Sequence, residues 1–207
     1  MPYPVAVSVE PSLTGRNRLT TAFRLILAIP HLILVGGAGF GFAYRESNTA
    51  FSGETGLLGA VAAFLAVISW FTIVLAGLHI IGIRQFCAFY MRWRVRALSY
   101  LMLLQDPYPP FGDAPYPASI EVADPIGPRN RLTVGFRLFL AIPHFVVLVF
   151  VLAAWGVVTI IAWFAILFTG AYPRGLYDFA VGSLRWRLRV EAYLLLLVDE
   201  YPPFSLS

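Results

Sequence analysis

Long apolar stretches separated by short polar segments dominate this chain. In its first half they run from about Leu19 to Phe42 and from Leu57 to Ile83, and the polar segment Tyr44–Gly56 divides them. Each stretch exceeds the ~20 residues that a helix needs to cross a hydrocarbon core. The dividing segment carries charged side chains that lipid would not solvate, so it must be a loop. The pattern predicts a transmembrane helical hairpin.

The second half holds one continuous apolar run, from Leu132 to Pro173. Its 42 residues suffice for two spans of ~20 residues joined by a tight turn. We place that turn at Ala153–Gly156. The alternative is an interfacial helix that ends at Ile142, followed by one long span that begins at Pro143.

The two halves repeat the same sequence blocks, which favours a hairpin in both copies. Equivalent residues are offset by 113 positions at the start of the copies and by 93 at their ends, so the first copy has 20 extra residues between its apolar stretches. The recurring blocks are Arg16–Thr20 with Arg129–Thr133, Ala28–His31 with Ala141–His144, Arg92–Arg96 with Arg185–Arg189, and the closing hooks Asp106–Phe111 with Asp199–Phe204.

Two further elements flank each predicted hairpin. Val5–Glu10 and Ala118–Val122 alternate apolar and polar residues, which predicts brief strands that pair with each other. Phe86–Gln105 and Phe179–Val198 each carry three arginines near the middle, too costly to cross a bilayer. They are predicted to be interfacial amphipathic helices on the cytoplasmic face, although Arg92–Arg96 also alternates as a strand would.

Composition and charge place the chain in a membrane. Hydrophobic residues make up 59% of it and charged residues 13%, against roughly 25% charged in soluble domains. All 15 basic residues are arginine and the net charge is +4, which indicates anionic lipid rather than nucleic acid as a partner. The single cysteine, Cys87, rules out an internal disulfide.

Nearly all arginines flank the open ends of the predicted hairpins, and Arg45 alone lies in a hairpin loop. Positive charge marks the cytoplasmic side. We therefore expect a multi-pass protein of the plasma (inner) membrane with both termini cytoplasmic. The predicted fold class is an all-α integral membrane protein. It consists of two tandem parallel repeats that are related by an axis along the membrane normal. Each repeat has a short strand, a transmembrane hairpin and an interfacial helix, which gives four spans in total. The boundaries are 1–111 for the first repeat, 112–128 for a linker with a short strand, and 129–207 for the second repeat.

Ionisable residues inside the spans are the candidate site. Arg24 and His31 are seven residues apart and share a helix face, and Arg137 and His144 repeat the arrangement. One interpretation is that these four groups converge near the twofold axis and hold an anionic head group. The other is that the arginines snorkel to lipid phosphates and the histidines are neutral.

The residues before each first span form a second candidate site. Asn17 and Asn130 suit helix N-capping, and the arginines beside them could seat a phosphate at a helix start. The full set of candidate lipid or ligand residues is Arg16, Arg18, Arg24, His31, Arg129, Arg131, Arg137 and His144. The predicted interfacial anchors are Arg92, Trp93, Arg96, Arg185, Trp186 and Arg189.

The predicted spans contain neither Asp nor Glu, which removes carboxylate proton relays and carboxylate-bound metal sites. Nor does the sequence contain a phosphate-binding Gly-rich loop, a nucleophile elbow or a zinc motif. We therefore expect no enzyme activity, no cofactor and no metal.

These blocks resemble a bacterial, often actinobacterial, membrane family catalogued as domain of unknown function 4389. The resemblance covers nearly the whole chain, once per repeat, and Trp163–Gly175 with the final hook is especially typical. The first copy departs from the pattern at Gly77–Ile80. The resemblance implies a multi-span membrane protein and supplies no activity.

The sequence thus favours a non-enzymatic scaffold or accessory subunit that binds anionic lipid, a partner membrane protein or a second copy of itself. The alternative is a small transporter or channel component with an Arg/His-lined path between the repeats.

Overall fold

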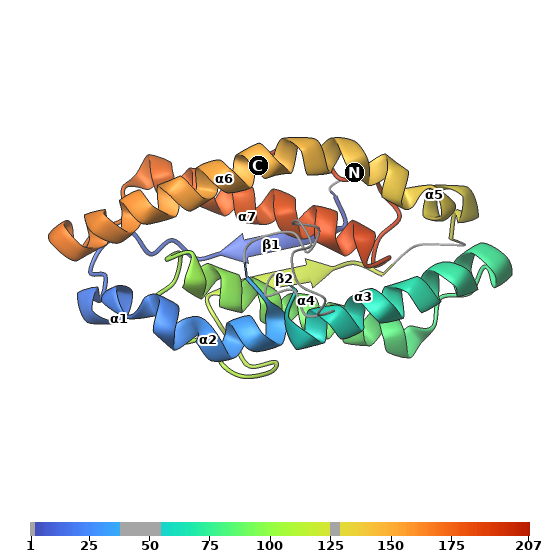
Figure 1. The fold of residues 1–207 in the computed structure, drawn as a ribbon, viewed down its shortest axis with the longest axis horizontal. Helices are drawn as coiled ribbons and strands as arrows, with labels where there is room; N and C mark the ends of the chain where they lie inside the picture. Colours follow the sequence, from blue (N-terminus) through green and yellow to red (C-terminus); the bar gives the residue numbers. More distant parts are fainter. Residues whose placement is uncertain (1–2, 38–54, 125–128) are drawn as a thin grey trace, which may run out of the picture.

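The structure is a computed structural model that describes residues 3–37, 55–124 and 129–207. It is mostly helical, and two short strands lie at its centre (Figure 1). In the described part of the chain, two helical segments are long and apolar enough to cross a membrane, Gly56–Ala76 and Arg137–Thr169. The sequence pattern predicts four.

The two strands pair as the sequence predicts. β1 (Val5–Val9) lies antiparallel to β2 (Ala118–Val122), with Val7 opposite Ile120 at the centre. Residues 7 and 120 are equivalent in the two repeats, so this pair marks a pseudo-twofold axis perpendicular to the ribbon. The axis relates the two repeats and makes their helices run in opposite directions (Figure 1).

The second copy contains one long helix and no hairpin. α6 (Arg137–Thr169) runs for 33 residues, about 50 Å at 1.5 Å per residue. The turn predicted at Ala153–Gly156 is wrong. Only Gly156 in that segment disfavours a helix, and the Trp155 side chain is fully buried there, so packing keeps the chain helical through the segment.

The first copy follows the same path with an interruption. α2 (Arg24–Val35) has 12 residues, and α3 (Gly56–Phe71) with the π-helical turn η1 (Thr72–Ala76) has 21, which together match α6. A Cβ added to Gly56 would lie 2.4 Å from the Gly36 nitrogen, so α3 resumes where α2 ends. The two helices lie end to end, and the predicted side-by-side hairpin is wrong here too (Figure 1). The predicted loop Tyr44–Gly56 falls outside the described residues, except for Thr55 and Gly56.

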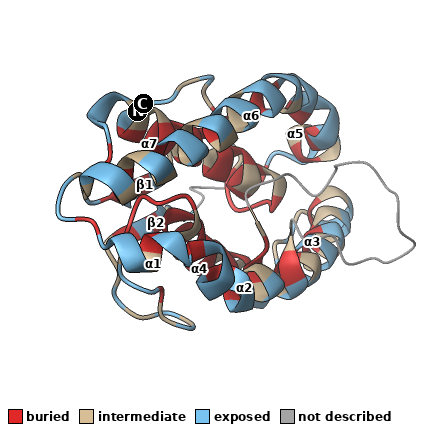
Figure 2. Ribbon diagram, turned by 60° about the vertical axis from the view of Figure 1, so that its left-hand side comes forward, coloured by how far each residue is buried: buried red, intermediate tan, exposed pale blue. Residues whose placement is uncertain are grey.

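Beneath the long helices lie α4 (Ile81–Leu101) and α7 (Arg174–Leu194). Both arginine-rich segments are therefore helices, and the strand alternative is excluded. α4 packs against α2 and α3, and α7 packs against α6 and β1. Both are largely buried within the protein (Figure 2), so they form part of its core.

The repeats interlock through two short helices, α1 (Arg18–Ala22) and α5 (Arg131–Gly135). The Asn17 and Asn130 side chains cap them, as predicted. Each short helix packs against the far end of the other repeat's long helix. The Trp163 indole donates to the Thr21 carbonyl at 2.9 Å, and Trp70 donates to the Val134 carbonyl at 2.9 Å. Buried residues of both repeats therefore belong to one hydrophobic cluster.

A distance measurement separates one long helix from a hairpin. Nitroxide labels at Leu138→Cys and Phe168→Cys, in a Cys87→Ala background, should lie about 45 Å apart at 1.5 Å per residue. Both positions are exposed. Double electron–electron resonance reads this distance directly. A hairpin would bring the labels to within about 20 Å, because packed helices lie 8–10 Å apart.

Candidate functional site

A buried cluster of two arginines and one aspartate ties together the parts of the first repeat. Arg16 precedes α1, Arg24 opens α2, and Asp106 begins the hook that follows α4. One carboxylate oxygen of Asp106 lies 2.8 Å from both guanidinium groups, whose side chains are 0% and 2% exposed. Asp106 also accepts a hydrogen bond from the Asn17 backbone at 3.0 Å. Burial alone would raise the pKa of Asp106, but hydrogen bonds from Arg16 and Asn17 hold it below its usual value.

Backbone carbonyls satisfy most of the remaining guanidinium donors. Arg24 donates to the Tyr100 carbonyl at 3.3 Å and to the Gln105 carbonyl at 2.5 Å, and it lies 4.1 Å above the Tyr100 ring. Arg16 donates to the Leu103 carbonyl at 2.7 Å. These contacts fix the turn that leads from α4 into the hook.

The second repeat builds the same cluster. Asp199 lies 2.8 Å from both Arg129 and Arg137. Arg137 donates to the Tyr193 carbonyl at 2.7 Å and lies 4.3 Å from the Tyr193 ring. Arg129 donates to the Leu196 carbonyl at 2.7 Å.

The two turns held in this way are strained. Leu103 has a φ of +63° and Leu196 has a φ of +62°, and no other described non-glycine residue has a positive φ. A left-handed leucine costs about 1–2 kcal/mol. The same left-handed conformation occurs at equivalent positions in the two repeats. This indicates that the arginine contacts to the Leu103 and Leu196 carbonyls maintain each turn.

Each histidine stands in an aromatic cluster of its own repeat. The Trp93 indole donates to His31 Nδ1 at 3.1 Å, and the Phe111 ring of the hook stacks on His31 with centroids 4.6 Å apart. Trp186 donates to His144 at 3.1 Å, and Phe204 stacks on it at 4.0 Å. Because Nδ1 accepts a hydrogen bond, each ring is the neutral tautomer that carries its proton on Nε2. The recurring blocks of the sequence thus assemble into one packed unit per repeat.

Arg24, His31, Arg137 and His144 do not converge at the twofold axis, as one interpretation of the sequence required. α2 and α6 begin at opposite ends of the molecule (Figure 1), because the axis reverses the second repeat. Each arginine pairs with the aspartate of its own repeat. Their guanidinium groups point into the protein and do not snorkel to its surface.

The other predicted lipid-binding residues divide into buried and exposed pairs. Arg16 and Arg129 are buried in the clusters, whereas Arg18 and Arg131 are exposed. Arg18 lies over Gly170, where α6 ends, and Arg131 lies over Gly77, where η1 ends. A cation at a helix C-terminus is favourable there because of the helix dipole.

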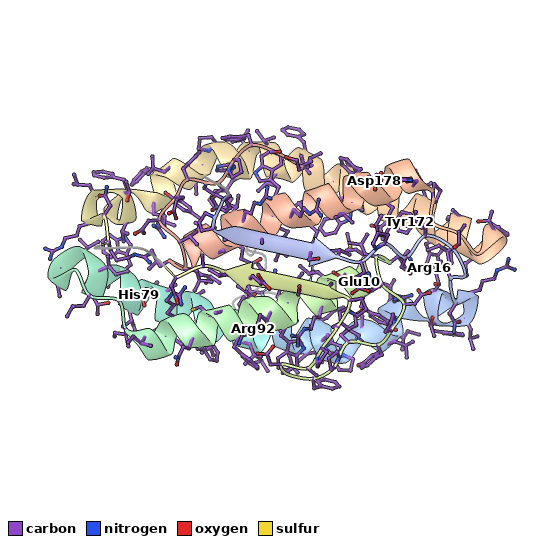
Figure 3. The ribbon with its side chains drawn as sticks, turned by 180° about the vertical axis from the view of Figure 1, so that it is seen from behind. Glu10, Arg16, His79, Arg92, Tyr172 and Asp178 are labelled. Atoms are coloured by element: carbon purple, nitrogen blue, oxygen red, sulfur yellow. The ribbon has the colours of Figure 1, made fainter. Side chains whose placement is uncertain are left out.

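The predicted interfacial anchors are mostly engaged within the protein. Trp93 and Trp186 are buried against the histidines. The remaining four donate to protein acceptors: Arg92 and Arg96 to Asp113, Arg185 to the Val7 carbonyl, and Arg189 to the Ser207 carbonyl. Figure 3 shows Arg92 on α4, seen from the side of the ribbon.

Arg94, Arg187 and Glu191 are central residues that no sequence motif singled out. Arg94 donates to the carbonyls of Val35 and Gly37 at the end of α2 and forms an ion pair with Glu191 at 2.7 Å. Arg187 donates to the Gly37 carbonyl at 3.3 Å. Helical spacing could have identified Arg94 as a buried residue, since it places Arg94 on the face opposite Arg92 and Arg96.

Comparison with known proteins gives a family and no activity. The family described as a domain of unknown function (DUF4389) matches residues 53–112 and 131–205, and the chain belongs to it. No curated protein and no solved structure matches the chain. Among the described residues, no three of His, Cys, Asp and Glu lie together as a metal site would require.

Removing the charge of Asp106 tests the structural role of the cluster. Asp106→Asn should lower the free energy of unfolding by about 2–3 kcal/mol, because it leaves two buried guanidinium groups without their counter-charge. Thermal unfolding followed by circular dichroism measures this. Asp113→Asn is the matched control: Asp113 is 40% exposed, so its loss should cost less than about 1 kcal/mol.

The same variant should change how stability depends on pH. The folded-state pKa of Asp106 lies below its usual value. Its contribution is therefore complete above the unfolded pKa of ~3.9 and is lost as pH falls below it. Asp106→Asn should remove that part of the acid destabilisation.

Equal losses in the free energy of unfolding of Asp106→Asn and Asp113→Asn at neutral pH would show that the cluster does not hold the fold.

Proposed function

We propose that this protein is a non-enzymatic membrane scaffold or accessory protein that binds the anionic surface of one leaflet. Its long helices would lie in the plane of the membrane. The observation that carries the proposal is the contrast between two faces of the molecule, one apolar and formed by α1–α3, η1, α5 and α6, the other polar and formed around the ribbon. We call these the apolar face and the ribbon face.

The side chains on the apolar face support contact with lipid. On α6, Leu138 is 62% exposed and Phe150 is 73% exposed, and on α3 Phe64 is 66% exposed. Large exposed apolar residues recur along both long helices, and extended apolar surface of this kind marks contact with a membrane or another protein. The described residues of these helices carry no charged side chain except arginine.

The ribbon face supports an in-plane orientation. Ser8, Ser119 and Glu121 are exposed there, and the ribbon runs alongside the middle of the long helices (Figures 1 and 3). If those helices crossed the bilayer, Glu121 would sit near its centre, where a carboxylate costs about 2.5–3.5 kcal/mol. With the helices in the plane, both repeats meet the leaflet in the same way and the twofold axis follows the membrane normal.

Charge supports a preference for anionic lipid. Arg18 and Arg131 are the exposed cations of the apolar face, one on each short helix. Guanidinium groups bind phosphate oxygens in a bidentate manner. Positions at the two ends of the apolar face would let them contact head groups while the long helices contact acyl chains.

The remaining predictions are proposals of the same kind. We infer a bacterial plasma membrane as the location, with both termini on the cytoplasmic side. The Tyr3 hydroxyl donates to the Glu200 carbonyl at 3.3 Å, so the two terminal segments lie together. A transport path lined by Arg24, His31, Arg137 and His144 finds no support, because the two clusters lie apart and their arginines are bonded to the protein.

Vesicle binding tests the proposal. The protein should float with vesicles that contain phosphatidylglycerol and bind pure phosphatidylcholine vesicles more weakly. Arg18→Gln/Arg131→Gln should lose about 2 kcal/mol of binding to anionic vesicles, about thirtyfold, at about 1 kcal/mol per arginine. The control Arg92→Gln on α4 removes a charge from outside the apolar face and should change binding little. Equal affinity for neutral and anionic vesicles in all variants would contradict the proposal.

A further inference from the structure

We propose that a groove at the seam between the two repeats binds one acyl chain of a membrane phospholipid. The groove has a volume of about 340 Å³, at the lower end of the ~300–1,000 Å³ typical of small-molecule sites. Its apolar walls come from the start of α2, the end of α4 with the turn that follows it, and the last third of α6. They are formed by Leu25, Leu101, Leu103, Ile160, Trp163 and Phe164.

Most polar groups of the groove are already bonded within the protein. Arg24 contributes to the lining, and both of its terminal nitrogens donate to Asp106 or to backbone carbonyls. Its Nε has no partner but is buried. The Thr159 hydroxyl donates to the Trp155 carbonyl at 2.8 Å. A head group placed here would find few donors, whereas a hydrocarbon chain needs none. The chemistry of the walls therefore selects the acyl chain over the phosphate.

The location of the groove identifies the source of the chain. Leu25 is 69% exposed and Ile160 is 60% exposed, and both belong to the apolar face. The groove is therefore continuous with the surface that would contact lipid, and a chain could enter it from the leaflet. This inference rests on the proposed function, to which it adds a defined lipid site.

Because α2 belongs to the first repeat and α6 to the second, a bound chain would contact both. Each CH₂ group that the groove removes from water adds to the stability of the complex. An occupied groove should therefore strengthen the seam and raise the thermal stability of the protein, as any ligand that binds only the folded state does.

The test fills the groove with a larger side chain. Ile160→Trp places an indole in it, and Ile161→Trp is the matched control, since Ile161 is exposed on the same helix and does not line the groove. Native mass spectrometry follows delipidated protein incubated with phosphatidylglycerol in mild detergent. Wild type and Ile161→Trp should retain a bound phospholipid, and Ile160→Trp should retain about tenfold less. Phosphatidylglycerol should raise the melting temperature of the first two proteins only.

Further outcomes separate this site from the apolar face as a whole. All three proteins should still bind anionic vesicles, so a loss of vesicle binding would count against the proposed function and not against the groove. Phosphatidylcholine should compete with phosphatidylglycerol for retention, because the acyl chain is recognised. Retention by Ile160→Trp equal to wild type, or retention of anionic lipid alone, would overturn the acyl-chain site.

Discussion

A guanidinium group that is removed from water must keep hydrogen-bond acceptors for its N–H donors. The fold depends on how the protein supplies these acceptors to its buried arginines. Four arginines flank the starts of α2 and α6, and all four are buried. Each pair finds one aspartate and several backbone carbonyls at the far end of α4 or α7. The clusters thereby join the start of each long helix to the hook of the same repeat. Removing one partner would leave buried charge, which is far costlier than removing the pair.

Duplication then gives the molecule two equivalent halves. The pseudo-twofold axis passes between Val7 and Ile120, and each short helix packs against the far end of the other half's long helix. The 20 extra residues of the first copy interrupt its long helix without changing its course. Arg94 and Arg187 lie at that interruption, where they donate to the Gly37 carbonyl. The same arrangement leaves apolar side chains on one face and polar side chains on the other, which is the basis for the proposed contact with a leaflet.

Several features could be predicted from the sequence because they depend on local pattern. These are the paired strands, the asparagine caps and the helical nature of α4 and α7. Whether the apolar segments fold as hairpins could not be predicted in the same way. Hydropathy gives the length of an apolar run and does not show whether the helix turns within it. Arg24 and Arg137 stand out in the sequence by their position beside apolar segments. Their ion-pair partners could not be predicted, since the acceptor of Arg24 lies 82 residues away along the chain and that of Arg137 lies 62 residues away.

If the long helices lie in the plane of one leaflet, the depth of spin labels on α6 in vesicles shows it. Nitroxides at Leu138, Phe150 and Phe168 on α6, and at Ser8 on the ribbon, would be compared by their accessibility to oxygen and to a water-soluble nickel reagent. The three α6 labels should lie at a similar depth of about 5–10 Å, and Ser8 should be fully exposed to water. A label at Phe150 near the bilayer centre, with shallow labels at both ends of α6, would contradict it.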